Sequence, residues 1–211
     1  MAQVLLPGPK PPASPSISNL VSTILKVTED DIVPTLRESG KAGNMPFGAA
    51  ILSKSNLQPV AVAANNFRKS PLLHGETNCI REFFEIDASK RPDTKDCIFI
   101  ATHEPCSLCL SGIAWTSFPT VYYLFTYQET HDQLGVGKDI RILEEIFRVP
   151  APSDTEESLR NRPLYNETNK LFTIKPIKQL ISEITDEAGK KLAESEMERV
   201  KRLWEDLRHG V

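Results

Sequence analysis

Two short motifs hold the side chains best suited to chemistry in this sequence. The first is His74-Gly75-Glu76, and the second is Pro105-Cys106-Ser107-Leu108-Cys109. Cys106 and Cys109 are one helical turn apart, so their sulfurs can converge on one point at the start of a helix. A helix N-terminus also lowers the pKa of a thiol, which favours the thiolate form that binds metal ions. The pair is therefore expected to bind a metal or to act as a redox dithiol.

Adding His74 to the two cysteines favours zinc. One imidazole and two thiolates suit Zn²⁺ and leave the fourth tetrahedral position open for water, as in catalytic zinc sites. A structural zinc site needs a fourth protein ligand, and neither Cys79 nor His103 has the spacing to provide one. We expect His74, Cys106 and Cys109 to hold one catalytic zinc ion.

Glu76 places a proton carrier beside the expected metal site. It follows His74 by two residues on the same expected helix, so it can reach an activated water without binding the metal. A carboxylate there can take a proton from the water and pass it to a substrate nitrogen and to the leaving group. His-x-Glu followed by Pro-Cys-x-x-Cys is a signature of zinc deaminases. The alternatives are a redox pair, which would not account for His74 and Glu76, a structural zinc site, and a chance match.

The overall composition narrows the class of protein. The chain has 211 residues, of which 40% are hydrophobic and 25% are charged, as in a globular domain with an appendage. The formal net charge of −3 disfavours a large basic surface for nucleic acid. No apolar run approaches the ~18 residues of a membrane span, and four cysteines without a secretory signal indicate a reducing compartment. We expect a soluble protein of the cytoplasm or nucleus that binds neither nucleic acid nor membrane.

The hydrophobic pattern predicts the elements that position these motifs. A helix begins near Thr28, where acidic residues fill its first turn. A continuous apolar run over 97–102 is typical of a strand in a sheet that is covered on both faces. The other elements expected between 28 and 147 are strands over 46–52, 60–64 and 121–125 and helices around 79–84, 106–115 and 140–147.

The order of these elements predicts an α/β fold, a three-layer α/β/α sandwich. The strand–helix–strand unit between 97 and 125 predicts two parallel strands joined by a right-handed crossover. We assign 1–20 to a proline-rich flexible tail and 21–150 to the zinc-dependent domain. Residues 151–211 form a linker and a C-terminal helical extension, which is charged, amphipathic and divided at Gly189.

At its two motifs the sequence resembles the cytidine-deaminase-like superfamily, in the branch of nucleobase and tRNA-adenosine deaminases. The resemblance covers roughly residues 28–147, and its second half is similar to guanine deaminases in particular. The segments that carry the resemblance are Met45-Pro46-Phe47-Gly48-Ala49, Asn66-Phe67-Arg68, Glu104 to Trp115, and Leu134-Gly135 with Ile140 to Phe147.

This resemblance implies the same zinc ligands and proton carrier, and it adds three substrate-binding residues. The Asn66 side chain would hydrogen-bond the substrate base, and Phe47 and Trp115 would form walls of the pocket. The resemblance also implies a mixed five-stranded sheet and a homodimer whose partner completes the pocket.

Departures from the family pattern lie where the substrate edge would be read. The loop between Asn66 and His74 is shorter than is common in this branch. The acidic residue that guanine deaminases carry before the Leu-Gly pair has no clean counterpart, and Glu129 and Asp132 are the nearest candidates. We expect a zinc-dependent hydrolytic deaminase of a small amino-heterocycle, such as free guanine or cytosine, that releases ammonia. The alternatives are a tRNA adenosine-to-inosine deaminase and a non-catalytic subunit of a deaminase complex.

Overall fold

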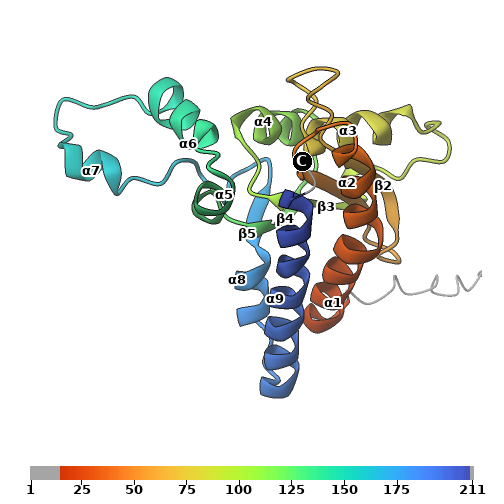
Figure 1. The fold of residues 1–211 in the computed structure, drawn as a ribbon. Coiled ribbons are helices and arrows are strands. Elements are labelled where there is room, and N and C mark those ends of the chain that lie inside the picture. Colours follow the sequence, from red (N-terminus) through yellow and green to blue (C-terminus); the bar gives the residue numbers. More distant parts are fainter. Residues whose placement is uncertain (1–14, 210–211) are drawn as a thin grey trace, which may run out of the picture.

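A mixed five-stranded sheet lies at the centre of the protein, and helices cover both of its faces (Figure 1). The structure is a computed structural model, and it describes residues 15–209. The strand order is β2-β1-β3-β4-β5, with β1 antiparallel to both of its neighbours and β3, β4 and β5 parallel. The strands are β1 Gly48–Ser53, β2 Pro59–Ala64, β3 Cys97–His103, β4 Thr120–Phe125 and β5 Thr173–Pro176. The predicted α/β/α sandwich with a mixed sheet is confirmed.

The sequence of β3 explains why it lies in the middle of the sheet. All seven of its residues are buried, as expected for a continuous apolar run that is covered on both faces. Phe99 and Ala101 face one helical layer, while Ile98 and Ile100 face the other. The next two elements are α4 (Ser107–Trp115) and β4, which pairs parallel to β3 as predicted for this strand–helix–strand unit.

Different helices cover the two faces. On one face lie α3 (Gly75–Glu85) and α4, and α1, α2, α8 and α9 pack on the other (Figure 1). The remaining elements are α1 Ile17–Val27, η1 Thr28–Ile32, α2 Val33–Gly40, η2 Thr94–Asp96, α5 Tyr127–Leu134, α6 Lys138–Ile142, η3 Leu143–Phe147, α7 Glu156–Arg160, α8 Ile177–Ser182 and α9 Glu187–His209. Among residues 15–209, no helix has both the length and the apolar character needed to cross a membrane.

The first helix begins earlier than the sequence pattern predicts. It starts at Ile17, where the Ser16 side chain accepts a hydrogen bond from the Asn19 N–H, and it passes through a π-helical turn into α2. The predicted start near Thr28 is therefore wrong, and the last residues of the predicted tail 1–20 are helical. Residues 1–14 of that tail lie outside the described part of the chain. The helix forms because its apolar residues bury one stripe against α8 and α9, and these are Leu20, Val21, Ile24 and Leu25.

The segment beyond Pro150 is part of the same sheet and core, not a separate extension. Strand β5 lies in the region predicted to be a linker, and it pairs in parallel with β4. Helices α8 and α9 then pack beside α1. The break between them lies at residues 183–186 instead of Gly189, whose N–H donates to the Asp186 carboxylate at 2.6 Å.

Trp204 anchors α9 to the rest of the fold. Its side chain is 1% exposed, and its indole N–H donates a hydrogen bond to the Pro46 carbonyl oxygen at 2.9 Å. The ring also contacts Phe125 edge-on, with 5.2 Å between centroids. The C-terminal helix is therefore joined to the segment that leads into β1.

Replacing this tryptophan should cost much more stability than replacing the other one. We expect Trp204→Ala to lower the free energy of unfolding by about 3–5 kcal/mol, because a large side chain leaves a cavity. Trp115, which is 89% exposed, is the matched control, and Trp115→Ala should change it by less than about 0.5 kcal/mol. Denaturant unfolding of both variants measures the difference, and equal effects would contradict the packing described for α9.

Candidate active site

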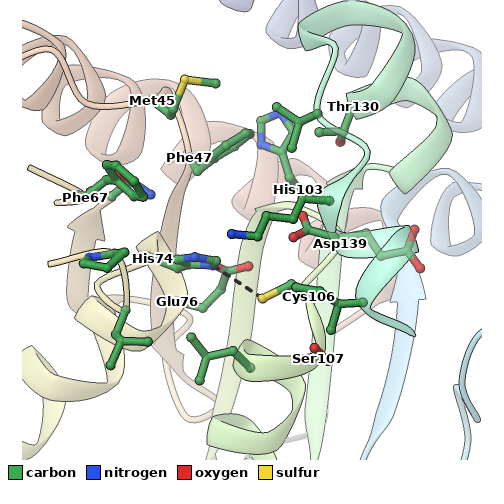
Figure 2. Close-up of a pocket in the computed structure, with 18 of the residues that line it drawn as sticks. Met45, Phe47, Phe67, His74, Glu76, His103, Cys106, Ser107, Thr130 and Asp139 are labelled. Atoms are coloured by element: carbon green, nitrogen blue, oxygen red, sulfur yellow. Dashed lines mark hydrogen bonds between the residues drawn. The ribbon is translucent and has the colours of Figure 1, made fainter. Parts of the chain in front are cut away.

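The N-termini of α3 and α4 meet at the end of the sheet where β1 begins and β3 ends. His74 is the N-cap residue of α3 and Cys106 is the N-cap residue of α4, and both have extended backbone angles. Neither side chain makes the usual capping hydrogen bond to its own helix. Instead, these two side chains turn toward each other (Figure 2).

The His74, Cys106 and Cys109 donor atoms lie at the spacing of three zinc ligands. The imidazole Nδ1 of His74 is 3.4 Å from the Cys106 sulfur and 3.5 Å from the Cys109 sulfur. The two sulfurs are 3.5 Å apart. Tetrahedral zinc, with bonds of about 2.3 Å to sulfur and about 2.0 Å to nitrogen, separates such ligands by about 3.5–3.8 Å. The three predicted ligands are therefore brought together, and their geometry fits the metal.

Protons are shared unevenly within this group. Contact with the Cys109 thiol, together with His74, lowers the pKa of Cys106 to about 4. The Cys106 thiolate in turn raises the pKa of His74 to about 9, and burial raises the pKa of Cys109. Metal ligands must be deprotonated, so zinc binding would displace the protons held by His74 and Cys109.

A contact between two glycines sets the position of α3. A Cβ atom on Gly75 would lie 2.7 Å from the Gly48 Cα atom, and one on Gly48 would lie 2.7 Å from a methyl carbon of Ile32. The N-terminus of α3 can approach the start of β1 only because both residues lack side chains. This close approach places His74 and Glu76 at the floor of the site.

Glu76 occupies the first turn of α3 and lines a cavity beside the three ligands. It is 7% exposed, and burial is the main reason that its pKa is raised to about 7. A pKa near neutrality suits a group that accepts and returns a proton during one reaction.

The cavity has a volume of about 460 Å³, which is in the usual range for small-molecule sites. Phe47 forms part of its apolar wall, as expected. Its polar lining includes Asn65, Glu76, His103 and Asp139, which come from four different segments (Figure 2 labels the last three). A flat, polar heterocycle matches this combination of an aromatic wall and a few polar groups.

Two of the predicted substrate-binding residues do not line this cavity. Trp115 is the last residue of α4 and is 89% exposed, so it does not form a wall of the pocket. The lining asparagine is Asn65 and not Asn66, because Asn65 directly follows β2 and is 4% exposed. Its Oδ1 accepts a hydrogen bond from the Phe67 N–H at 3.0 Å. The sequence pattern alone does not indicate which of the two adjacent asparagines lines the cavity.

The acidic residue in the pocket is Asp139, which the sequence motifs did not indicate. Glu129 instead caps α5 and pairs with Lys201, and Asp132 pairs with His131 at the surface. Asp139 lies in α6 and is partly buried, and burial raises its pKa to about 6. The nearest sequence signal is the pair of glycines at 135 and 137, which ends α5 and turns the chain back toward the cavity.

His103 also lines the cavity. It is the last residue of β3 and is 7% exposed. Burial lowers its pKa to about 3, so the imidazole is neutral at physiological pH.

Comparisons with known proteins find similar deaminases. A family model described as the cytidine and deoxycytidylate deaminase zinc-binding region matches residues 31–125. Guanine deaminase of Bacillus subtilis (strain 168) is 34% identical over 112 residues, which span 52% of this chain and 67% of that protein. An X-ray structure of guanine deaminase from Bacillus subtilis aligns with 71% of this chain and 86% of its own, at 26% identity and a TM-score of 0.49. A guanine deaminase structure from Nitrosomonas europaea aligns with 93% and 96%, at 15% identity and a TM-score of 0.43.

The matched family segment contains the whole zinc donor set and the buried glutamate. It includes both motifs, from His74 to Cys109, and both strands of the predicted strand–helix–strand unit. The relative from Bacillus subtilis matches over most of its own length. The chain therefore belongs to the cytidine-deaminase-like superfamily and is a zinc-dependent deaminase.

Proposed function

We propose that this deaminase hydrolyses guanine to xanthine and ammonia, with zinc held by His74, Cys106 and Cys109. The observation that carries the proposal is a second carboxylate, Asp139, which lines the same cavity as Glu76. In Figure 2 the two acidic side chains extend toward the Cys106 sulfur from α6 and α3. Two carboxylates near one reacting carbon suit a substrate in which that carbon lies between two different ring nitrogens, one with a proton and one without.

Guanine has this arrangement at the carbon that bears its amine. C2 lies between N3, which carries no proton, and N1, which carries one. In cytosine and adenine the corresponding carbon has a ring nitrogen on one side and a carbon on the other. A carboxylate accepts hydrogen bonds when ionised and donates one when protonated, so one acid can serve N3 and the other N1–H. The pair of acids therefore favours guanine over the other two bases.

The chain's own residues would move the protons and hold the ring. Zinc, when bound, supplies a Lewis acid that activates water for attack on C2. Glu76 would accept a proton from that water, deliver it to N3, and pass the second proton to the departing ammonia. Asp139 would accept a hydrogen bond from N1–H throughout. Phe47 and the other apolar lining residues would hold the flat ring and limit the entry of bulk water.

Removing one thiolate should remove the metal. We expect about one zinc ion per chain in the wild type and a much lower content in Cys109→Ala, because the site loses one of three ligands. Cys79→Ala is the matched control, since Cys79 is also a buried thiol but lies on the core-facing side of α3 and outside the donor set. Elemental analysis of the purified proteins measures the zinc content. Full zinc in Cys109→Ala would show that this donor set is assigned incorrectly.

Replacing the buried glutamate should stop proton transfer and leave the metal in place. We expect Glu76→Gln to lower kcat for guanine by about 10²–10⁴-fold with unchanged zinc content. Glu82→Gln, on the exposed surface of the same helix, should retain full activity. Ammonia release and the absorbance change to xanthine give the rates. Normal turnover by Glu76→Gln would refute the mechanism, and activity on tRNA adenosine instead of guanine would refute the substrate.

Asp139 should act on the affinity for the substrate ring. We expect Asp139→Asn to lower kcat/KM for guanine by about 10–100-fold, the usual effect of losing a hydrogen bond to a charged group. Asp132→Asn, at an exposed acid on the neighbouring helix, should have no effect. Steady-state kinetics with guanine measures both variants. Equal kinetics of Asp139→Asn and the wild type would remove Asp139 from the site.

A further inference from the structure

We propose that His103 reads the edge of the base opposite the amine, by donating a hydrogen bond from its Nε2–H to O6 or N7 of guanine. This inference rests on the proposed function and names the residue that would select a purine with acceptors on that edge. Neither the sequence motifs nor the proposed zinc chemistry uses His103.

Aromatic neighbours fix the orientation of the His103 ring. It stacks on Phe125 with 4.8 Å between centroids and an interplanar angle of 20°. Phe47 and Trp204 contact it edge-on, at 4.5 Å and 6.0 Å between centroids. Figure 2 shows His103 beside Phe47, on the opposite side of the pocket from the Glu76 carboxylate. The ring therefore has one defined orientation toward the cavity.

A buried hydroxyl determines which ring nitrogen carries the proton. Thr102 Oγ1 accepts a hydrogen bond from the Gly48 N–H at 3.0 Å, and it lies 3.0 Å from His103 Nδ1. Thr102 is 1% exposed, so its own hydroxyl proton needs an acceptor inside the protein. Within residues 15–209, Nδ1 is the acceptor in reach. Nδ1 therefore accepts, and the neutral imidazole carries its proton on Nε2.

The Nε2–H faces the cavity. Among the described residues, none accepts a hydrogen bond from this atom. Every fully buried side-chain nitrogen in the described part of the chain has a hydrogen-bond partner. Because His103 lines the cavity, we infer that Nε2 is reached from there. A largely buried donor without a protein acceptor gains a partner when a ligand presents one.

The charge of His103 determines what kind of acceptor it can select. Burial and the nearby Lys201 ammonium lower its pKa to about 3, and Lys201 is itself held over the Phe125 ring. A neutral N–H donor favours a carbonyl oxygen or a ring nitrogen and gives no charge attraction to an anion. It also opposes an amino group at the same position, because two donors would then face each other.

Guanine can offer an acceptor to the His103 Nε2–H and a donor to the Asp139 carboxylate at the same time. Its N1–H, which Asp139 would bind, lies next to the C6 carbonyl oxygen, and N7 follows on the same edge. 2,6-Diaminopurine has an unprotonated N1 and an amino group at C6, so it would present the wrong partner to both residues. Asp139 and His103 would thus read adjacent positions of one edge.

The test combines two variants with substrate analogues. His103→Leu replaces the imidazole with an apolar side chain of similar size that has no donor. His103→Gln provides an N–H donor at the same position. We expect His103→Leu to lower kcat/KM for guanine by about 10–100-fold and His103→Gln to recover most of the loss. 7-Deazaguanine lacks the N7 acceptor, and 6-thioguanine has a much weaker acceptor at C6. For the analogue that lacks the acceptor bound by His103, His103→Leu should lower kcat/KM by less than about threefold. An equal penalty for guanine and both analogues, or no penalty at all, would overturn the proposal.

A second measurement does not depend on activity. Nitrogen-15 NMR of the imidazole should show the neutral form with its proton on Nε2 at pH 7, and the Nε2–H resonance should shift when guanine is added to Glu76→Gln. Thr102→Val should mix the two tautomers. A proton on Nδ1 in the wild type would overturn the proposal. If the wild type releases no ammonia from guanine, the proposed function fails, whereas normal guanine turnover by His103→Leu refutes only the role of His103.

Discussion

The close contact between Gly75 and Gly48 is the constraint on which the site depends. It lets the first turn of α3 pack directly against the start of β1. His74 and Glu76, on either side of Gly75, then both line the cavity. The N-terminus of α4 arrives at the same place from the end of β3. Two positive helix ends therefore meet, which stabilises the thiolate that zinc binding requires. A methyl group on Gly75 would lie 2.7 Å from the Gly48 Cα atom, so α3 would have to move away from β1 and carry His74 with it.

Function and stability conflict at these helix ends. An N-cap residue ordinarily satisfies a free backbone N–H of its helix, but His74 and Cys106 give up this role to face each other. The same region buries Glu76 and, in part, Asp139, and it raises the pKa of both carboxyl groups. A fold optimised only for stability would place serine or aspartate at the caps and apolar residues in the cavity. Such local violations are the usual mark of an active site.

The sequence predicted the features that follow from spacing and failed where tertiary position decides. The His-x-Glu and Pro-Cys-x-x-Cys motifs have fixed local geometry, and the structure brings the three predicted ligand atoms together with Glu76 beside them. The cavity is lined by Asn65 and not by the predicted Asn66, because the exact end of β2 decides which of two adjacent side chains faces the cavity.

Short elements held by distant contacts were harder to predict. Strand β5 has four residues and exists because β4 offers an unpaired edge. Helix α6 has five residues, and only its return over the cavity makes Asp139 a lining residue. Trp115 illustrates the opposite error: an aromatic residue near a motif was expected in the pocket, but it lies at the exposed end of its helix.

The C-terminal helix α9 contains none of the sequence motifs, but it contacts residues in the cavity wall opposite the zinc ligands. Trp204 holds the Pro46 carbonyl and contacts His103, while Lys201 pairs with Glu129 of α5, the helix that also presents Thr130 to the cavity. One helix thus contacts both the segment that leads into β1 and the helix that presents Thr130. Helices α3 and α4 position the three candidate zinc ligands and Glu76, whereas α9 contacts the residues of the facing wall. A change at Trp204 would therefore act first on His103 and on the Pro46 carbonyl, which Trp204 contacts directly.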